Sequence, residues 1–184
     1  ENLYSNVGNY ASNTSFFKMF VKHEPFVVNV ALSKDVETKL IDYQIPGVKA
    51  IVRSVKEHDG AIDASDPGIG KTYMACAAIK SLKMSALIIC PRSAKMQWYE
   101  ALDHFGMRGS QAIKGIFSYE KMKFGNTPYL KVTKKVEELY GKKHKTVIYD
   151  WKIGEETVLF VDEAHRCNDW TTQNAKMLTA ARER

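Results

Sequence analysis

The stretch Ala-Ile-Asp-Ala-Ser-Asp-Pro-Gly-Ile-Gly-Lys-Thr-Tyr, at residues 61–73, decides the fold of this chain. A short apolar run at residues 61–64 leads into a loop with two glycines, and an amphipathic stretch follows the loop. Strand, loop and helix are therefore expected here in that order.

The loop has the chemistry of a triphosphate cradle. Gly68 and Gly70 permit backbone conformations that are closed to residues with a Cβ atom. Their N–H groups can then converge on phosphate oxygens at the positive end of the following helix. Lys71 would reach the β- and γ-phosphates, and the Thr72 hydroxyl would bind Mg²⁺. The full pattern has a glycine where Ser65 stands, so the alternative is a plain glycine-rich turn before a helix.

Length and charge restrict the class of protein. The 184 residues are enough for one domain with a real core. A net charge of +6 favours an anionic partner, with nucleic acid first. No apolar run approaches the roughly 18 residues of a membrane span, and no signal peptide is visible. The three cysteines lie far apart, which indicates reduced thiols of an intracellular protein in the cytoplasm or nucleus.

Predicted strands and helices alternate along most of the chain. Residues 86–90 and 157–161 are continuous apolar runs, which is typical of parallel strands buried on both faces. The other expected elements are helices at 45–55, 71–83 and 94–105, a weaker strand at 111–116, a short helix at 119–123, a helical stripe at 132–140, a strand at 146–149 and a helix at 171–182. This alternation predicts an α/β domain with a mainly parallel central sheet flanked by helices.

The N-terminal residues 1–39 do not show this alternation of strands and helices. Residues 1–15 are polar and resemble a loose arm, and residues 16–30 are apolar and favour one or two strands. We therefore divide the chain into an N-terminal arm with a small β-rich extension at residues 1–39 and a main domain at residues 40–184.

A second acidic motif follows the predicted strand at residues 157–161. Asp162 and Glu163 come directly after its last apolar residue, which places both carboxylates at the edge where open α/β sheets bind ligands. Asp162 would hold Mg²⁺ through water, and Glu163 would orient or deprotonate an attacking water molecule. An acidic pair that only caps the next turn is the alternative. Together with the loop at Lys71, the pair supplies both halves of a nucleotide–Mg²⁺ site.

The ordered set of motifs resembles the first RecA-like lobe of superfamily 2 helicases and translocases. The resemblance is carried by residues 40–44, 66–72, 89–93 with Trp98, 118–121 and 162–166. The Tyr-Gln pair, the Pro…Trp spacing, the Ser-Tyr-Glu segment and His-Arg followed by Asn168 are most similar to the Swi/Snf-type branch. That branch moves on double-stranded DNA and remodels protein–DNA complexes. The resemblance implies a RecA-like P-loop NTPase lobe that uses ATP and Mg²⁺.

The resemblance also implies a role for each matching residue. Gln44 would read adenine, Asp162, Glu163 and Lys71 would serve catalysis, and His165 would couple the nucleotide state to the nucleic-acid side. The residues expected to bind the nucleotide phosphates and metal are Asp66, Pro67, Gly68, Ile69, Gly70, Lys71 and Thr72. The residues expected around the phosphate backbone of one nucleic-acid strand are Pro91, Arg92, Ser93, Lys95, Ser118 and Tyr119.

Members of the resembling family need a second RecA-like lobe, which donates arginine fingers across the nucleotide cleft. Without an arginine finger, a phosphoryl-transfer site loses on the order of 10³–10⁵ in rate. We therefore expect this chain alone to bind ATP·Mg²⁺ weakly and to hydrolyse it barely, if at all.

Several alternatives stay open. An RNA or DNA unwinding helicase is the first, because Asp-Glu-Ala-His also marks RNA-processing enzymes. A non-catalytic nucleotide-binding scaffold is the second, and a P-loop kinase for a small metabolite is the third, although no Arg-rich lid segment is visible. The basic run at residues 131–145 favours a solvated helix face over an extra nucleic-acid contact. Trp98 is expected in the core rather than on a stacking surface.

Overall fold

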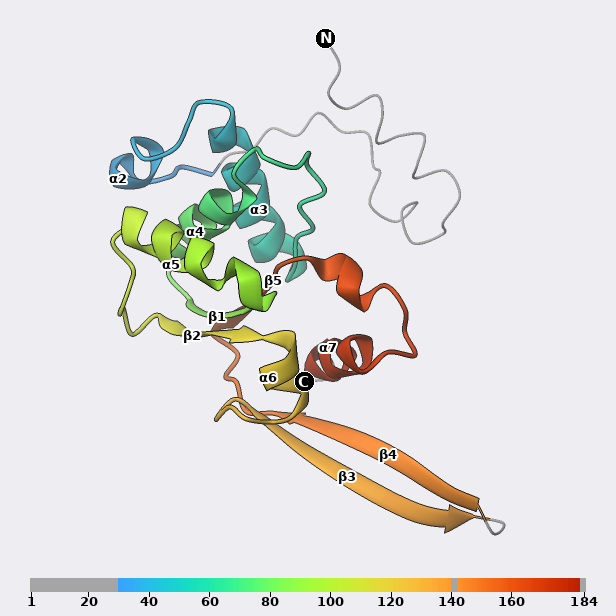
Figure 1. Ribbon diagram of the computed structural model, residues 1–184. Coiled ribbons are helices and arrows are strands. Elements are labelled where there is room, and N and C mark those ends of the chain that lie inside the picture. The colour runs from blue at the N-terminus through green and yellow to red at the C-terminus, as the bar shows by residue number, and fades with distance from the viewer. Residues whose placement is uncertain (1–29, 140–141, 183–184) are drawn as a thin grey trace, which may run out of the picture.

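The computed structural model describes residues 30–139 and 142–182, and its centre is a three-stranded parallel sheet (Figure 1). The strands are β1 (Ser85–Cys90), β2 (Ile113–Ser118) and β5 (Thr157–Val161), in the order β2-β1-β5. Helices flank this parallel sheet, which confirms the predicted α/β class and is consistent with a RecA-like helicase lobe.

The middle strand β1 is buried on both faces because its side chains alternate between two hydrophobic clusters. Ala86, Ile88 and Cys90 belong to the cluster on one face, and Leu87 and Ile89 belong to the cluster on the other. Each of these five residues is at most 1% exposed. The continuous apolar run at this strand is therefore explained by helices on both sides of the sheet.

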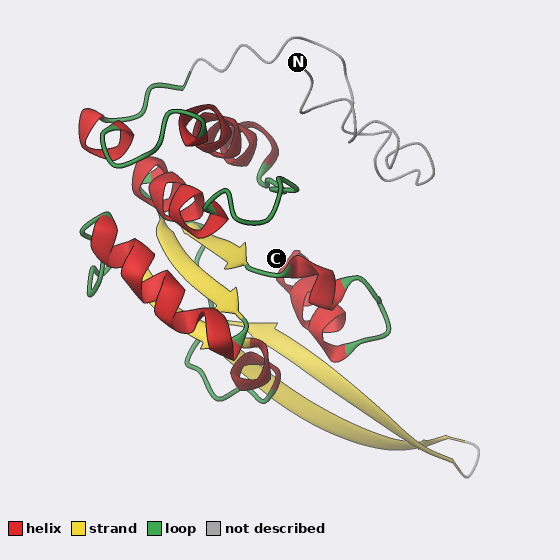
Figure 2. Ribbon diagram, turned by 45° about the horizontal axis from the view of Figure 1, so that its top comes forward, coloured by secondary structure: helices red, strands yellow, loops and turns green. Residues whose placement is uncertain are grey.

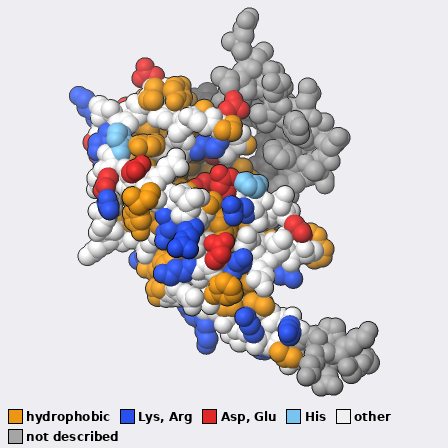
Figure 3. Space-filling model, viewed as in Figure 1, with side chains coloured by type: hydrophobic (Ala, Val, Ile, Leu, Met, Phe, Trp, Pro, Cys, Tyr) orange, Lys and Arg blue, Asp and Glu red, His pale blue; other side chains and the backbone are white. Residues whose placement is uncertain are grey.

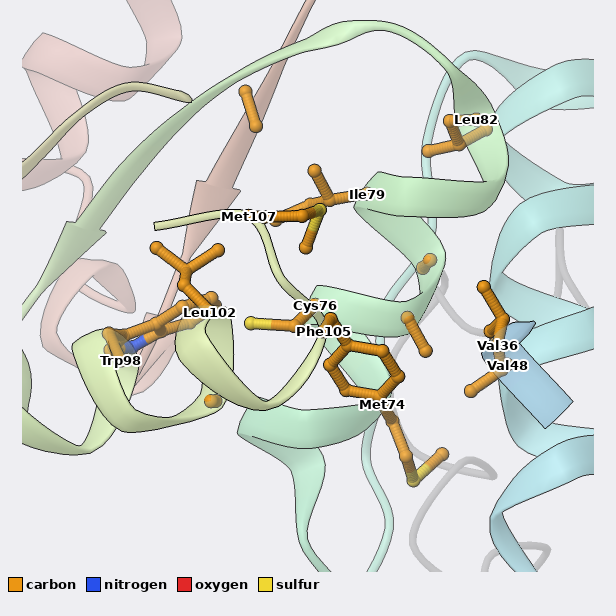
Figure 4. Close-up of a cluster of buried hydrophobic side chains, with 14 of the residues drawn as sticks. Val36, Val48, Met74, Cys76, Ile79, Leu82, Trp98, Leu102, Phe105 and Met107 are labelled. Carbon is orange, nitrogen blue, oxygen red and sulfur yellow. The ribbon is translucent and has the colours of Figure 1, made fainter. Parts of the chain in front are cut away.

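The first cluster lies among helices α2 (Lys34–Glu37), α3 (Gln44–His58), α4 (Lys71–Leu82) and α5 (Lys95–His104). The short helix η2 (Arg92–Ala94) connects β1 to α5. Figure 4 shows side chains of α4 and α5 meeting over the sheet, with side chains of α2 and α3 beyond α4. The labelled side chains are Val36, Val48, Met74, Cys76, Ile79, Leu82, Trp98, Leu102, Phe105 and Met107. The prediction that Trp98 lies in the core is confirmed, since this residue is 3% exposed.

The second cluster lies on the other face of β1. It is formed with α6 (Tyr119–Lys123), α7 (Gln173–Arg182) and the base of an antiparallel hairpin of β3 (Leu130–Leu139) and β4 (Lys142–Trp151). The short helix η3 (Ala164–Cys167) connects β5 to α7. The Thr172 hydroxyl accepts a hydrogen bond from the N–H of Ala175, so Thr172 caps the start of α7.

The prediction of a strand at residues 61–64 is wrong. No strand is present between residues 60 and 70, and Ile62 is 77% exposed. The Asp63 carboxylate accepts hydrogen bonds from the backbone N–H of Ser65, at 3.0 Å, and from the Ser65 hydroxyl. Such a local side-chain turn competes with strand pairing for the backbone. Among the residues that the structure describes, β5 pairs with β1 alone, and its residues are half-buried.

The prediction of a helical stripe at residues 132–140 is also wrong, because most of this segment is strand β3. The spacing of Val132, Val136 and Leu139 fits a helix, but the segment pairs with β4 over ten residue pairs. Val132 lies opposite Tyr149 and Leu130 opposite Trp151. Burial of these large side chains on one face of the hairpin outweighs the local helical pattern.

The predicted strands at residues 16–30 lie outside the described residues except for Val30. Leu32 and Val36 pack into the same cluster as α3 and α4, so the division of the chain at residue 40 stays a prediction. Within residues 30–139 and 142–182, no helix is long and apolar enough to span a bilayer.

Candidate functional site

The loop at residues 60–70 enters helix α4 through two glycines in left-handed conformations. Gly68 has a φ angle of 87° and Gly70 one of 86°, which residues with a side chain rarely adopt. Gly70 stands at the N-terminus of α4, and no side chain caps this end of the helix. The backbone N–H groups of the first turn therefore present the positive end of the helix to the loop. This arrangement suits an anion such as a phosphate group.

The Lys71 side chain folds back over the same loop. Its ammonium group donates to the carbonyl oxygens of Ser65 and Asp66, the latter at 3.0 Å. Both acceptors are neutral, so an anionic ligand in the loop would offer this group a stronger, charge-assisted partner. Thr72 follows on the first turn of α4 and is 8% exposed.

Gln44, at the start of α3, is tied to the loop. Its side-chain amide donates to the carbonyl of Ile69 at 2.9 Å, and its side-chain oxygen accepts from the N–H of Ile41 at 3.1 Å. A Cβ atom on Gly70 would lie 2.5 Å from the amide nitrogen of Gln44. The side chain is 5% exposed. Gln44 therefore positions the loop in this structure, and reading adenine would require it to exchange these backbone contacts.

Asp162 lies just past the end of β5 and is held by three elements. Its backbone N–H donates to the carbonyl of Ile89 at 2.8 Å, which continues the pairing with β1. The indole N–H of Trp98 donates to its carboxylate at 2.9 Å, and the hydroxyl of Tyr119 donates to its carbonyl at 2.6 Å. Burial, with the charge of Asp162 nearby, raises the pKa of Cys90 to about 11. The carboxylate is thus fixed at the edge of the sheet beside α5.

Glu163 takes a left-handed backbone conformation, with a φ angle of 55°, at the start of η3. This conformation is uncommon for a residue with a long side chain. Its carboxylate lies 3.0 Å from Nδ1 of His165, and both side chains are more than half exposed. The tight turn therefore places a carboxylate and an imidazole next to each other at the surface.

The glycine loop and the acidic pair lie at the same edge of the sheet. Only two residues connect the end of α4 at Leu82 to the start of β1 at Ser85, so α4 runs back across the sheet antiparallel to β1. Its first residue, Lys71, therefore lies toward the edge where β1 and β5 end. Figure 2 shows the loop before α4 beside the arrowhead of β5. Segments far apart in the sequence are thus brought together at this edge.

A groove of about 1050 Å³ lies beside this edge. Four of its side chains are cationic (Arg92, Lys95, Lys121 and Arg166), and one, Glu120, is anionic. The remaining lining residues are Pro91, Ser93, Ser118, Phe124 and Asn126. The surplus of positive charge suits a polyanion. Five of the six residues expected around a nucleic-acid backbone (Pro91, Arg92, Ser93, Lys95 and Ser118) therefore line one groove.

Tyr119 is the exception, and the expected contact of its side chain with nucleic acid is corrected by its burial. It is 1% exposed and does not line the groove. Its aromatic ring belongs to the core, and its hydroxyl is directed at the carbonyl groups of Asp162 and Glu163. Burial raises the pKa of Tyr119, so the hydroxyl keeps its proton and acts as a donor.

Sequence reasoning missed Arg166 as a residue of the groove. Arg166 follows the acidic motif directly, and η3 turns its side chain toward Ser118 and Lys121. The basic residue next to Asp-Glu-Ala-His is visible in the sequence, but only the fold shows that β2 and β5 flank β1 in one parallel sheet and therefore end at the same edge.

Comparisons with known proteins place the chain in a family. The family model described as Type III restriction enzyme, res subunit, matches residues 37–182. The protein named "Putative ATP-dependent RNA helicase L364" of Acanthamoeba polyphaga mimivirus is 27% identical over 178 residues, which cover 92% of this chain. The chain spans 33% of the length of that relative. No solved structure matches the chain. Both matches support a superfamily 2 helicase lobe, and the chain belongs to the family of the Type III restriction enzyme res subunit.

Proposed function

We propose that this chain is the ATP-binding lobe of an ATP-dependent translocase that moves on or remodels duplex DNA. One observation carries the proposal: the glycine loop before α4, the acidic pair after β5 and a cationic groove all lie at one edge of the sheet. A triphosphate and a nucleic acid could bind there next to each other, which is the arrangement that an ATP-driven motor requires.

The residues present fit a nucleotide triphosphate. The two left-handed glycines and the uncapped N-terminus of α4 supply N–H groups for phosphate oxygens. Lys71 would exchange its two carbonyl partners for phosphate oxygens. The hydrogen bond from Gln44 would meanwhile hold the Ile69 carbonyl away from the phosphates. The loop is thus prepared to receive a polyanion without rearrangement of α4.

The residues also fit Mg²⁺, which would neutralise charge on the phosphates when bound. Hydroxyl and carboxylate oxygens are the ligands that this ion prefers, and Thr72 and Asp162 offer one of each. Glu163 is the group that we assign to the attacking water. To accept a proton from that water, Glu163 would move away from His165. This change of partner would link hydrolysis to the conformation of η3.

Two side chains connect the groove to the proposed metal residue. Trp98 lies on α5, which follows directly on η2, where Arg92 and Ser93 line the groove, and its indole N–H donates to the carboxylate of Asp162. Tyr119 follows the groove residue Ser118 and binds the carbonyl of Asp162. A nucleic acid that shifts either wall of the groove would therefore move Asp162. We propose these two hydrogen bonds as the route by which nucleic acid stimulates hydrolysis.

The names of the relatives and the motifs of the chain bear on the type of nucleic acid. The mimivirus relative carries the name of an RNA helicase, which makes RNA unwinding the second candidate function. The family description is that of a restriction enzyme subunit, which favours DNA. The motif details of the Swi/Snf-type branch favour duplex DNA as well, so we place duplex DNA first.

We further propose that activity needs a second RecA-like lobe. The chain spans one third of the relative's length, and the side chain of Glu163, which we assign to the attacking water, is about half exposed. Without that lobe, turnover by this chain would be lower by on the order of 10³–10⁵.

Titration with ATP·Mg²⁺ tests the nucleotide site. Wild type is compared with Lys71→Ala and with the control Lys114→Ala, which removes the same charge from an exposed position on β2. The proposal predicts saturable binding by wild type and the control and strongly weakened binding by Lys71→Ala. Equal binding by all three proteins would instead support a scaffold that does not use the loop.

A second titration tests the substrate. Duplex DNA and single-stranded RNA of the same length are each added at several salt concentrations. The proposal predicts tighter binding to duplex DNA, and binding that weakens steeply with salt because phosphate contacts release counterions. Preference for single-stranded RNA would favour the helicase alternative.

A further inference from the structure

The hairpin of β3 and β4 projects away from the rest of the molecule (Figures 1 and 2). Each strand has ten residues, which corresponds to a length of about 33 Å. Two-stranded hairpins are marginally stable alone in water. A long ribbon that leaves the core therefore requires a firm base, and it offers a surface for a partner.

The base of the hairpin is firmly packed. Leu130 and Trp151, a cross-strand pair, are at most 1% exposed, and the indole N–H of Trp151 donates to the carbonyl of Met177 on α7 at 2.8 Å. Val132, Tyr149 and the partly buried Val147 on this face still pack against the second cluster. Val136, further along the same face, is 58% exposed. The base is thus rigid, and the outer part is held in solvent.

The outer part carries exposed positive charge on both faces. Lys134, Lys135 and Lys145 are exposed, and among the residues that the structure describes none of the three takes part in an ion pair. Lys145 lies opposite Val136 and Lys134 opposite Val147, so Lys134 and Lys145 are diagonal neighbours on one face. Like charges at such positions repel each other, and an anionic partner would relieve that repulsion.

The hairpin starts next to the cationic groove. Phe124 and Asn126, which line the groove, come just before β3. Between them lies Gly125, where a Cβ atom would lie 3.1 Å from the side chain of Val132. In Figure 3, Lys and Arg side chains gather over the middle of the visible face and continue down along the hairpin. The two basic surfaces are therefore neighbours.

We propose that the outer hairpin is a second contact for duplex DNA, in which Lys134, Lys135 and Lys145 bind backbone phosphates beyond the groove. The inference rests on the proposed nucleic-acid function and adds a surface to it. The major groove of B-form DNA admits a two-stranded ribbon, whereas the major groove of A-form RNA is too narrow and deep for side chains to enter. The shape of the hairpin therefore favours DNA over RNA duplexes.

The test measures binding of a fluorescent 30-base-pair DNA duplex to the full chain by anisotropy at several salt concentrations. The hairpin variant is Lys134→Gln/Lys135→Gln/Lys145→Gln, which keeps exposed polar side chains on the strands. The charge-matched control is Lys56→Gln/Lys83→Gln/Lys114→Gln, at exposed positions outside the groove and hairpin. The groove variant is Arg92→Gln/Lys95→Gln/Lys121→Gln.

The hairpin variant is expected to bind more weakly than the control. Its slope of log affinity against log salt should be smaller by about 0.9 for each phosphate that the three lysines no longer neutralise. Affinity equal to that of the control would overturn the inference. The three lysines would then serve to prevent the hairpin strands from pairing with the strands of another molecule. Weakened binding confined to an RNA duplex would overturn it as well.

These outcomes are distinguishable from failure of the proposed function. If wild type binds DNA and only the groove variant binds it more weakly, the hairpin inference is overturned while the function stands. If wild type binds no duplex at all, the proposed nucleic-acid function fails first.

Discussion

Replacement of Gly70 by alanine tests how the loop before α4 is built. Gly68 and Gly70 have nearly the same positive φ angle, 87° and 86°, so an alanine at either position experiences the same backbone strain. Their surroundings differ. A Cβ atom at Gly68 would meet nothing within 4 Å, whereas one at Gly70 would lie 2.5 Å from the amide nitrogen of Gln44. Gly68→Ala is therefore a matched control for the strain alone.

The magnitudes follow from these contacts. An alanine in the left-handed conformation costs about 1–2 kcal/mol, which is the whole expected effect of Gly68→Ala. Gly70→Ala must also displace the Gln44 amide, which is 5% exposed and bonded to the Ile69 carbonyl. Loss of a buried hydrogen bond adds about 1–3 kcal/mol. Gly70→Ala should therefore destabilise the chain by about 2–5 kcal/mol.

The assay is urea unfolding of wild type, both single glycine variants, Gln44→Ala and the double variant Gly70→Ala/Gln44→Ala, with free energies from linear extrapolation. Because Gln44→Ala removes the group that meets the new methyl, the double variant should be destabilised less than the sum of the two single variants, by about 0.5–3 kcal/mol. Equal destabilisation by Gly68→Ala and Gly70→Ala, or strict additivity in the cycle, would refute the contact between Gln44 and Gly70.

Three further outcomes are expected. Tyr119→Phe removes the hydroxyl bond to the Asp162 carbonyl and should lower the free energy of unfolding by about 1–3 kcal/mol, while duplex DNA affinity in the anisotropy assay stays at the wild-type value because Tyr119 is buried. Trp151→Phe leaves the Met177 carbonyl without its donor and should cost about 1–3 kcal/mol in the same unfolding assay; a neutral result would mean that the hairpin base is not fixed by this bond. Hydrogen bonds from Lys80 and Ser33 lower the pKa of Asp35 from 3.8 to about 2, so the unfolded chain binds the proton more readily and this stabilisation, complete above about pH 4, is lost as the pH falls toward 2. Asp35→Asn should therefore flatten the fall in Tm between pH 4 and pH 2, and an unchanged slope would contradict that assignment.

The central sheet is predictable because short local sequence patterns determine its strands and the helices beside it. The apolar runs at β1 and β5 and the helical spacing of α4 and α5 each decide one element without reference to distant residues. A residue that directly follows a predicted strand, such as Asp162 after β5, is thereby placed at the edge of the sheet. Five of the six residues expected at a nucleic-acid backbone line one groove, and their contact with nucleic acid stays a prediction.

The errors arise where distant or polar contacts decide the structure. The helical spacing in residues 132–140 gives no sign that β4 buries Leu130 and Val132 against Tyr149 and Trp151. The apolar run at residues 61–64 gives no sign that Asp63 binds Ser65 and holds the backbone in a turn. In both places a contact outside the local pattern outweighs propensity.

The placement of Tyr119 is a third case. The resemblance places Ser118 and Tyr119 together at a nucleic-acid backbone, and Ser118 indeed lines the groove. One position further on, α6 begins, and the helical turn directs the ring inward to the second core cluster. A change of one residue thus separates a surface contact from a buried link to Asp162, which residue type alone does not reveal.

The most direct test of the central claim is a crystal structure of this chain with Mg²⁺ and a non-hydrolysable ATP analogue. We expect one triphosphate bound by the N–H groups of Gly68 to Thr72, with the Lys71 ammonium on its phosphates and the Asp162 carboxylate facing the same metal ion. A triphosphate bound elsewhere, or one that contacts Lys71 while Asp162 stays bonded to Trp98 and away from the metal, would contradict it.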